Sequence, residues 1–251
     1  MFPTRLTLIT YNIWNTQRWD VRKPALEQFL QIYNPDIFCL QELREETRDF
    51  IDETLTQHQR VHDDLPGWTR EGNIYWNADL FSEVAHGAED VGLLETHRRL
   101  FWVRLKLKGT EKTIFVSTAH FTYQRHPKEC ETGVNPRLEQ TKRTIQSLEQ
   151  LTQEGEPTFF MGDLNDNIHP PLLLHEAGYI SCFASLGLLP PTTHPCYPTT
   201  NKSAGDRVSN QTIDWLVANR HCKALAAQVP QCYYGDVAPS DHWPVLAVYE
   251  I

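Results

Sequence analysis

Short apolar stretches recur along the chain, and their spacing distinguishes strands from helices. Two stretches near the start, Leu6–Ile13 (LTLITYNI) and Asp36–Glu42 (DIFCLQE), are short and rich in residues that favour β-structure. Between them, Val21–Tyr33 carries apolar residues at helical spacing, and Asn34-Pro35 predicts where this helix ends. A strand, a helix and a second strand in this order are typical of the start of an α/β layer.

Strand-like stretches dominate the rest of the chain. They are Asn73–Trp76, Phe101–Lys106, Thr113–Phe121, Pro157–Met161, Thr212–Ala218 and Trp243–Tyr249. A second long helix is predicted where Asn135 can cap it, Pro136 begins it and an apolar stripe continues to about Gln153. The alternation predicts an α/β fold of two mixed sheets covered by helices. The stretch Leu189–Asn210, rich in proline and threonine, is predicted to be a long loop.

Four of the predicted strands end in polar side chains. Asn12, Glu42 and His120 close three strands, and Asp163 and Asn165 follow a fourth directly in the sequence GDLN. Strands that share an orientation have their carboxyl ends at one edge of a sheet, where α/β proteins commonly bind ligands. We therefore expect these side chains to converge.

The stretch SDHWPV lies just before the last predicted strand. If that strand is antiparallel to the others, Asp241 and His242 lie at the same edge, and Asp214 is the remaining acid of the set. Oxygen ligands without a thiolate suit Mg²⁺ or Mn²⁺ better than zinc, and because Mg²⁺ takes one or two carboxylates, other acids must handle protons. Each residue alone also fits a structural role, such as a turn or a half-buried histidine, so the joint placement carries the prediction.

Composition and charge limit the classes of protein that fit. The chain has 251 residues, of which 40% are hydrophobic and 22% charged, and it contains neither a linker nor an internal repeat, so we expect one domain over residues 1–251. A net charge of −9 disfavours a protein that coats duplex nucleic acid but is compatible with an enzyme whose metal ion meets phosphate. Scattered cysteines, strand-sized apolar runs and no signal-peptide pattern predict a cytoplasmic protein without a membrane span.

Six motifs, in order, resemble those of a known family. They are TYNIW (10–14), LQE (40–42), STAHF (117–121), GDLN (162–165), IDW (213–215) and SDHWPV (240–245). Together they resemble the endonuclease/exonuclease/phosphatase superfamily of DNase I-like proteins over nearly the whole chain. The resemblance implies a four-layer α/β/β/α sandwich and Mg²⁺- or Mn²⁺-dependent phosphoester hydrolysis. Many members have Leu-Asp or Leu-Glu after the histidine where this chain has Phe121-Thr122, which leaves the subfamily open.

The resemblance also implies a role for each matched residue. Glu42 would bind the metal, with Asn12 beside it and Asp241 as a second carboxylate on the metal side. Asp163 would position and deprotonate the attacking water, and Asn165 would hold a phosphate oxygen.

The two histidines and their partners complete the implied set. His242 would stabilise charge on the phosphoryl oxygens, with Asp214 orienting its ring, and His120 would contact the phosphate or the leaving group. Glu71 is a candidate partner of His120, and a solvated loop acid is the alternative interpretation. The candidate substrate contacts are Arg137, Tyr123 and Trp14.

Three interpretations of function stay open. Aromatic and basic residues in the loops, such as Thr122–Val134, favour a phosphodiesterase acting on nucleic-acid ends or single strands. A phospholipid or an inositol phosphate is the alternative substrate for the same chemistry, although no basic amphipathic helix supports a lipid substrate. A catalytically silent binding protein is disfavoured because every expected catalytic position is occupied. No obligate protein partner is implied.

Overall fold

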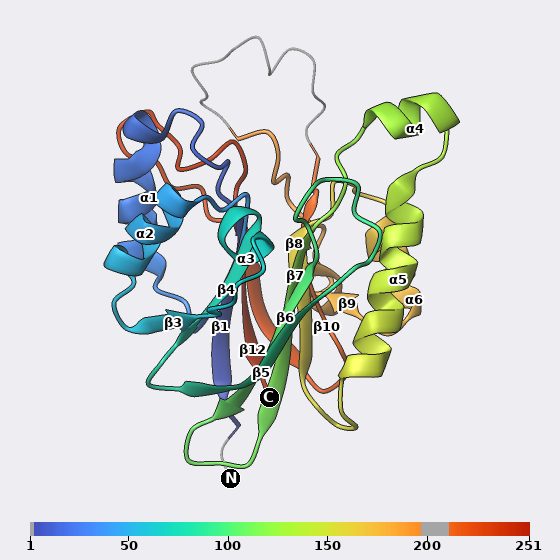
Figure 1. Ribbon diagram of the computed structural model, residues 1–251. Helices are drawn as coiled ribbons and strands as arrows, with labels where there is room; N and C mark the ends of the chain where they lie inside the picture. The colour runs from blue at the N-terminus through green and yellow to red at the C-terminus, as the bar shows by residue number, and fades with distance from the viewer. Residues whose placement is uncertain (1–2, 197–210) are drawn as a thin grey trace.

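The computed structural model describes residues 3–196 and 211–251, and in these residues two six-stranded sheets lie face to face (Figure 1). The first sheet has the order β11-β12-β1-β2-β4-β3, with β1 Arg5–Asn12, β2 Ile37–Gln41, β3 His58–Arg60, β4 Gly72–Asn77, β11 Lys223–Gln228 and β12 Val245–Glu250. The second has the order β5-β6-β7-β8-β10-β9, with β5 Phe81–Glu89, β6 Leu100–Leu107, β7 Thr113–His120, β8 Thr158–Asp163, β9 Ile180–Ser181 and β10 Asp214–Ala218.

Helices cover the outer face of each sheet, as Figure 1 shows. On the first sheet lie α1 Trp19–Tyr33 and α2 Glu45–Thr54, and on the second lie α5 Pro136–Leu151 and α6 His169–Glu176. The shorter helices are α3 Gly67–Arg70, α4 Pro127–Thr132 and α7 Cys182–Ser185. This arrangement is the four-layer α/β/β/α sandwich that the sequence predicts. None of the helices in the described residues is long and apolar enough to cross a bilayer.

The alternation of side chains along the central strands builds three separate cores, one between the sheets and one beneath the helices of each sheet. In β1, Leu6 and Leu8 pack between the sheets, whereas Ile9 and Tyr11 pack beneath the helices on the outer face. The strands β2, β7, β8 and β10 alternate in the same way. Because successive strand residues point to opposite faces, every second residue of each strand continues the core between the sheets.

Strand directions bring the predicted polar residues to one end of this core. β1 is parallel to β2, and β7 is parallel to β8, whereas β12 and β10 run antiparallel to their neighbours β1 and β8. The register places His120 and Asp214 on either side of Asp163. The strand ends of β1, β2, β7 and β8 and the starts of β10 and β12 therefore meet at one edge, opposite the two chain ends (Figure 1).

The predicted central strands and the two long helices are present, and the elements that the sequence did not indicate are peripheral. The helix α2 has the polar sequence EETRDFIDET, and β5 and β11 are edge strands with irregular register. Edge strands pack on fewer neighbours, so their sequences alternate less clearly. Of the predicted loop Leu189–Asn210, residues 197–210, with Tyr197, Lys202 and Arg207, lie outside the described residues.

Candidate active site

The candidate active site is the last layer of side chains in the core between the sheets. In this layer the strand residues are polar instead of apolar, but their side chains still point between the sheets. Apolar residues fill most of this core, and buried Thr10 and Thr118 follow them on β1 and β7. The same strand faces end in the polar side chains of Asn12, His120, Asp163 and Asp214. All four are at most 6% exposed. The edge of the sandwich thus becomes a buried polar cluster contributed by both sheets.

Asp163 lies at the centre of this cluster. Its Oδ2 accepts a hydrogen bond from Asn12 Nδ2 at 3.0 Å. The Nε2 atoms of His120 and His242 lie 3.3 Å and 3.7 Å from the same oxygen. Burial alone would raise the pKa of Asp163, but the two imidazoles more than offset burial and hold this pKa well below its usual range. Asp163 is therefore ionised at neutral pH.

His242 is held from behind by Asp214. The Nδ1 atom of His242 lies 2.9 Å from Asp214 Oδ2, so its Nε2 atom faces Asp163. Burial would lower the pKa of His242, yet Asp214 and Asp163 raise it well above its usual range. Thr193 fixes the start of β10 because its hydroxyl accepts hydrogen bonds from the backbone N–H groups of Ile213 and Asp214 at 3.0 Å and 3.2 Å.

The other side of the cluster contains the acids predicted to bind metal. Glu42 follows β2 with a φ of 57° and accepts hydrogen bonds from Asn15 Nδ2 at 2.6 Å and Asn12 Nδ2 at 3.3 Å. Although burial opposes it, His120, His242 and these amides hold the pKa of Glu42 below its usual range. Sequence reasoning missed Asn15, which belongs to none of the matched motifs.

Asp241 differs from the other acids of the site in its electrostatics. Burial raises its pKa to about 6, and the charge of Glu42 adds to this rise, although His242 opposes it. Two half-buried carboxylates that repel each other are a donor set for a divalent cation, and hard oxygen ligands suit Mg²⁺ or Mn²⁺. The residues present therefore fit the metal that the sequence predicts.

Arg22 ties the loop that precedes Asp241 to the loop after β1, which carries the Glu42 partner Asn15. Its buried guanidinium donates hydrogen bonds to the carbonyl oxygens of Trp14 at 2.8 Å, Asn15 at 2.7 Å and Pro239 at 2.7 Å. The first two carbonyls belong to the loop after β1, and the third belongs to the loop before Asp241. A helix residue that the sequence did not single out thus ties the two loops together.

Asn165 turns back toward β7. Its backbone N–H donates to Asp163 Oδ1 at 2.9 Å, and its Nδ2 donates to the Phe121 carbonyl at 3.0 Å. Its φ of 49° is one that asparagine tolerates. Gly162 precedes Asp163 where a Cβ would lie 2.0 Å from the Ala119 carbonyl, so the glycine of GDLN permits the close approach of β7 and β8.

Two predicted side chains have their polar groups occupied within the protein. Arg137 is 3% exposed and pairs with Glu129 at 2.5 Å while donating to the Thr122 carbonyl at 3.0 Å. Glu71 forms an ion pair with Arg98 at 3.2 Å, and the structure records no ion pair between Glu71 and His120. His120 Nδ1 has no hydrogen-bond partner among the described residues. The charged groups of Arg137 and Glu71 are thus directed mainly to other partners, and their roles in the site stay predictions.

The two aromatic candidates differ in exposure. Tyr123 is 44% exposed and follows the strand end that carries His120, whereas Trp14 is half-buried with the Arg22 guanidinium 5.4 Å from its ring centroid. Gln124, next to Tyr123, donates to the Asn165 carbonyl at 3.0 Å. The exposed ring of Tyr123 packs edge-on against His126 with centroids 5.2 Å apart, and Trp14 belongs to the loop that follows Asn12.

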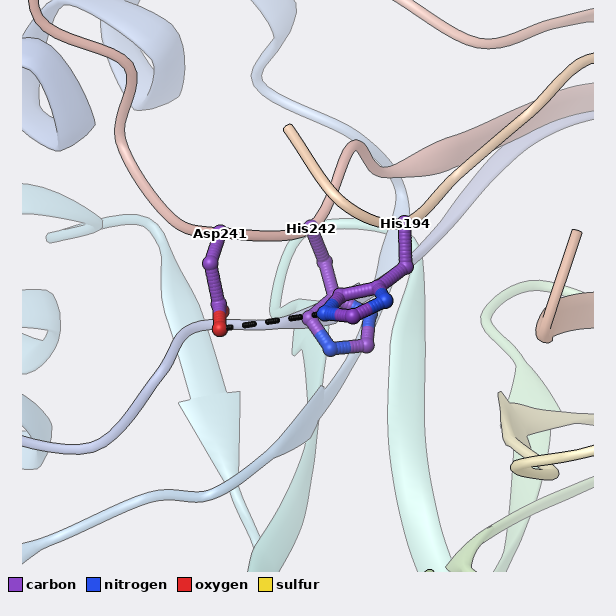
Figure 2. A group of neighbouring side chains, drawn as sticks. All are labelled: His194, Asp241 and His242. Carbon is purple, nitrogen blue, oxygen red and sulfur yellow. Dashed lines mark ion pairs between the residues drawn. The ribbon is translucent and has the colours of Figure 1, made fainter. Parts of the chain in front are cut away.

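A third histidine, which sequence reasoning missed, lies against the site. The rings of His194 and His242 have centroids 4.5 Å apart, and His194 Nε2 is 4.0 Å from Asp241 Oδ2 (Figure 2). Burial and the charge of His242 lower the pKa of His194 to about 3, so its imidazole is neutral. His194 lies in the predicted loop, where no periodicity could indicate its direction.

Comparison with protein families identifies the class of this protein. A family model described as Endonuclease/Exonuclease/phosphatase family matches residues 9–242. The chain belongs to this family, whose members are hydrolases that act on phosphoester bonds. Among curated proteins, no relative matches the sequence.

Solved structures of several differently named proteins share this fold. D. rerio TDP2 complexed with single-strand DNA product is 15% identical with a TM-score of 0.78, and the match covers 99% of this chain and 100% of that one. A Bacteroides thetaiotaomicron mannosyl-6-phosphatase is 17% identical with a TM-score of 0.77 over 97% and 99% of the two chains. The human Nocturnin catalytic domain with bound sulfate is 17% identical with a TM-score of 0.74 over 98% and 93%. At these identities the likeness extends to the fold.

Proposed function

We propose that the protein is a divalent-cation-dependent phosphodiesterase that cleaves nucleic acid at ends or in single strands. The observation that carries the proposal is the carboxylate of Asp163, which is ionised, buried and shared by Asn12, His120 and His242. A carboxylate in this setting can orient a water molecule for in-line attack on phosphorus and accept its proton.

The remaining side chains divide the work around this carboxylate. His242, kept cationic and oriented by Asp214, donates to a phosphoryl oxygen on which charge develops. His120 contacts the phosphate or the leaving oxygen, and the proposed role of Asn165 is to hold a non-bridging oxygen. For that role the amide must exchange its bond to the Phe121 carbonyl for one to the phosphate.

Glu42 and Asp241 would hold the metal, with Asn12 between Glu42 and Asp163. When bound, Mg²⁺ or Mn²⁺ supplies positive charge to the phosphoryl oxygens and the leaving group. The protein prepares for this charge by keeping Glu42 ionised and by fixing it between Asn12 and Asn15.

Exposed residues beside the cluster support a nucleic-acid substrate. Tyr123 and Arg125 are exposed on the segment that follows His120, and Gln124 ties this segment to Asn165. An exposed aromatic ring and a cation next to a phosphate site suit an unpaired nucleotide, because the base stacks while the backbone meets the charge. The TDP2 structure with single-strand DNA product shows that this fold accommodates such a strand. The cytoplasmic location stays a prediction.

A substrate panel tests the proposal. Bis-p-nitrophenyl phosphate, single-stranded oligonucleotides with different 5′ and 3′ ends, sphingomyelin, inositol phosphates and a sugar 6-phosphate are each incubated with Mg²⁺ and with EDTA. We expect Mg²⁺-dependent cleavage of the oligonucleotides. Turnover of lipid, inositol or sugar phosphates alone would replace the proposed substrate, and no turnover of any compound would refute the catalytic assignment.

A further inference from the structure

The space between His194, Asp241 and His242 has the composition of a transition-metal site. A nitrogen of each imidazole and an oxygen of Asp241 all lie within 4.8 Å of one another, and in Figure 2 the two rings overlap while a dashed line marks the ion pair of Asp241 with His194. Two nitrogens and one carboxylate oxygen form the mixed donor set that zinc prefers over magnesium. These donors therefore differ in kind from the oxygen ligands proposed for Mg²⁺.

One pair of these donors needs little adjustment to hold an ion, and the other two pairs lie within 4.8 Å. Tetrahedral ligands about 2.1 Å from zinc lie roughly 3.4 Å apart. His194 Nε2 and Asp241 Oδ2 are 4.0 Å apart, so a shift of about half an ångström closes the pair. The side chains of His194 and Asp241 are 22% and 24% exposed, which leaves a path for an ion from solvent.

His242 already has the environment of a metal-ligating histidine. Its Nδ1 atom lies 2.9 Å from Asp214 Oδ2, which leaves Nε2 as the atom that faces the cluster. Histidine ligands commonly have their second nitrogen held by a carboxylate in this way, which fixes the ring and raises its basicity. The Asp214–His242 pair thus supplies an oriented ligand as well as a phosphate contact.

We propose that His194, Asp241 and His242 bind Zn²⁺, and that occupancy of this site blocks hydrolysis. Binding releases the proton of His242 Nε2 to solvent, takes this nitrogen away from the phosphate and takes the Asp241 carboxylate away from the Mg²⁺ side. One ion then removes two groups on which the proposed function relies. The inhibition rests on that proposed function, but the binding of zinc does not.

Calorimetric titration of the full chain with ZnCl₂, without Mg²⁺, tests binding directly. We expect one tight site in the wild type and a loss of about 10–100-fold in affinity in His194→Gln. His86→Gln is the matched control, because His86 also lies between two carboxylates, 2.6 Å from Glu83 and 3.1 Å from Asp63, on the surface. The control is expected to keep the wild-type affinity. Equal affinity in wild type and His194→Gln would overturn the proposal.

Inhibition provides a second readout. With Mg²⁺ saturating and bis-p-nitrophenyl phosphate as substrate, the zinc concentration for half inhibition is expected to rise at least tenfold, about 1.4 kcal/mol, in His194→Gln and to stay unchanged in His86→Gln. If the wild type hydrolyses nothing while zinc binding still depends on His194, the proposed function fails and the site stands. If inhibition is the same in all three proteins, zinc acts elsewhere and the inhibitory site is refuted.

A second variant covers a failure to fold. His194→Phe keeps an aromatic ring against His242 and removes both ring nitrogens of residue 194. Circular dichroism checks that this variant folds. The d–d absorption of bound Co²⁺ in the visible range, present in the wild type and absent in His194→Phe, would support the site. An unchanged cobalt spectrum in a folded variant would contradict it.

Discussion

Asp163 lies at the centre of the polar cluster and Asp241 in its half-buried part, and their environments shift their pKa values in opposite directions. Asp163 is buried between two imidazoles, which hold its pKa well below the usual range. Burial raises the pKa of Asp241 to about 6, and the negative charge of Glu42 adds to that rise. A buried carboxylate needs a positively charged partner. The protein provides imidazoles as partners for Asp163, whereas a cation from solution would be the partner of Asp241. The contrast supports the proposed division of roles, in which Asp163 handles protons and Asp241 helps to bind a cation.

The largest effect is expected at Asp163, for which the protein itself supplies the positively charged partners. We expect Asp163→Asn to lower kcat for bis-p-nitrophenyl phosphate by about 10²–10³-fold, as loss of a key polar group in an active site commonly does. The amide cannot accept the proton of the attacking water. Steady-state kinetics measure the effect, and Asp79→Asn, at an exposed turn, is the control that should retain full activity. Near-normal turnover in a folded Asp163→Asn protein would contradict the proposed role of Asp163 as the group that accepts the proton.

A smaller effect, confined to the dependence of the rate on metal concentration, is expected at Glu42. Glu42→Gln should raise the Mg²⁺ concentration for half-maximal rate by about 10–100-fold and leave most of kcat at saturating Mg²⁺. The reason is that the amide loses a charge but keeps a hydrogen-bonding oxygen beside Asn12 and Asn15. Titration of the rate with MgCl₂ measures it. A fall in kcat that high Mg²⁺ does not restore would place Glu42 on the proton-handling side.

Arg22 links the loop after β1, which carries Asn15, to the loop before Asp241. In Arg22→Lys, the ammonium group cannot reach all four carbonyls that the guanidinium fork holds, those of Trp14, Asn15, Gln17 and Pro239. We expect Mn²⁺ affinity, followed by electron paramagnetic resonance, to fall by about tenfold while the side around Asp163 is unaffected. Lys23→Arg, one residue further along the same helix, is the matched control. Unchanged Mn²⁺ affinity in Arg22→Lys would mean that the loops hold their shape without the fork.

The smallest expected effect is one on stability, and it depends on pH. A carboxyl group whose folded pKa of about 6 exceeds its unfolded value binds more protons when folded, so its contribution to stability falls as pH rises from about 4 to about 6. Without metal, Asp241→Asn should therefore gain a few degrees in Tm relative to wild type between pH 4 and pH 7. Thermal melts at each pH, with and without Mg²⁺, measure it. A Tm difference that is constant with pH would show that Asp241 is not electrostatically strained.

The sequence predicts the framework of the site because each of its parts follows from a strand. Leu6 and Leu8 face the second sheet, and the same alternation directs Asn12 to Asp163. Order and parity along β1, β7 and β8 were therefore enough to bring distant residues together. Peripheral elements such as β11 were missed because an edge strand rich in alanine has little contrast between its two faces.

Residues outside this alternation escaped prediction. Asn15 and His194 lie in loops, where no period determines the direction of a side chain. Arg137 lies on a helix, and its sequence could not reveal that Glu129 and the Thr122 carbonyl would take up its donors. Contacts made through backbone carbonyls, like those of Arg22, leave no trace in residue type at the accepting positions.

The position of β12 has a consequence for synthesis of the chain. β12 lies inside the first sheet, hydrogen-bonded to β1 on one side and β11 on the other, although it follows every other described strand in the sequence. Until it inserts, Asp241 and His242 have no fixed place beside Asn12 and Asp163. The candidate site is therefore assembled only after translation has passed residue 250.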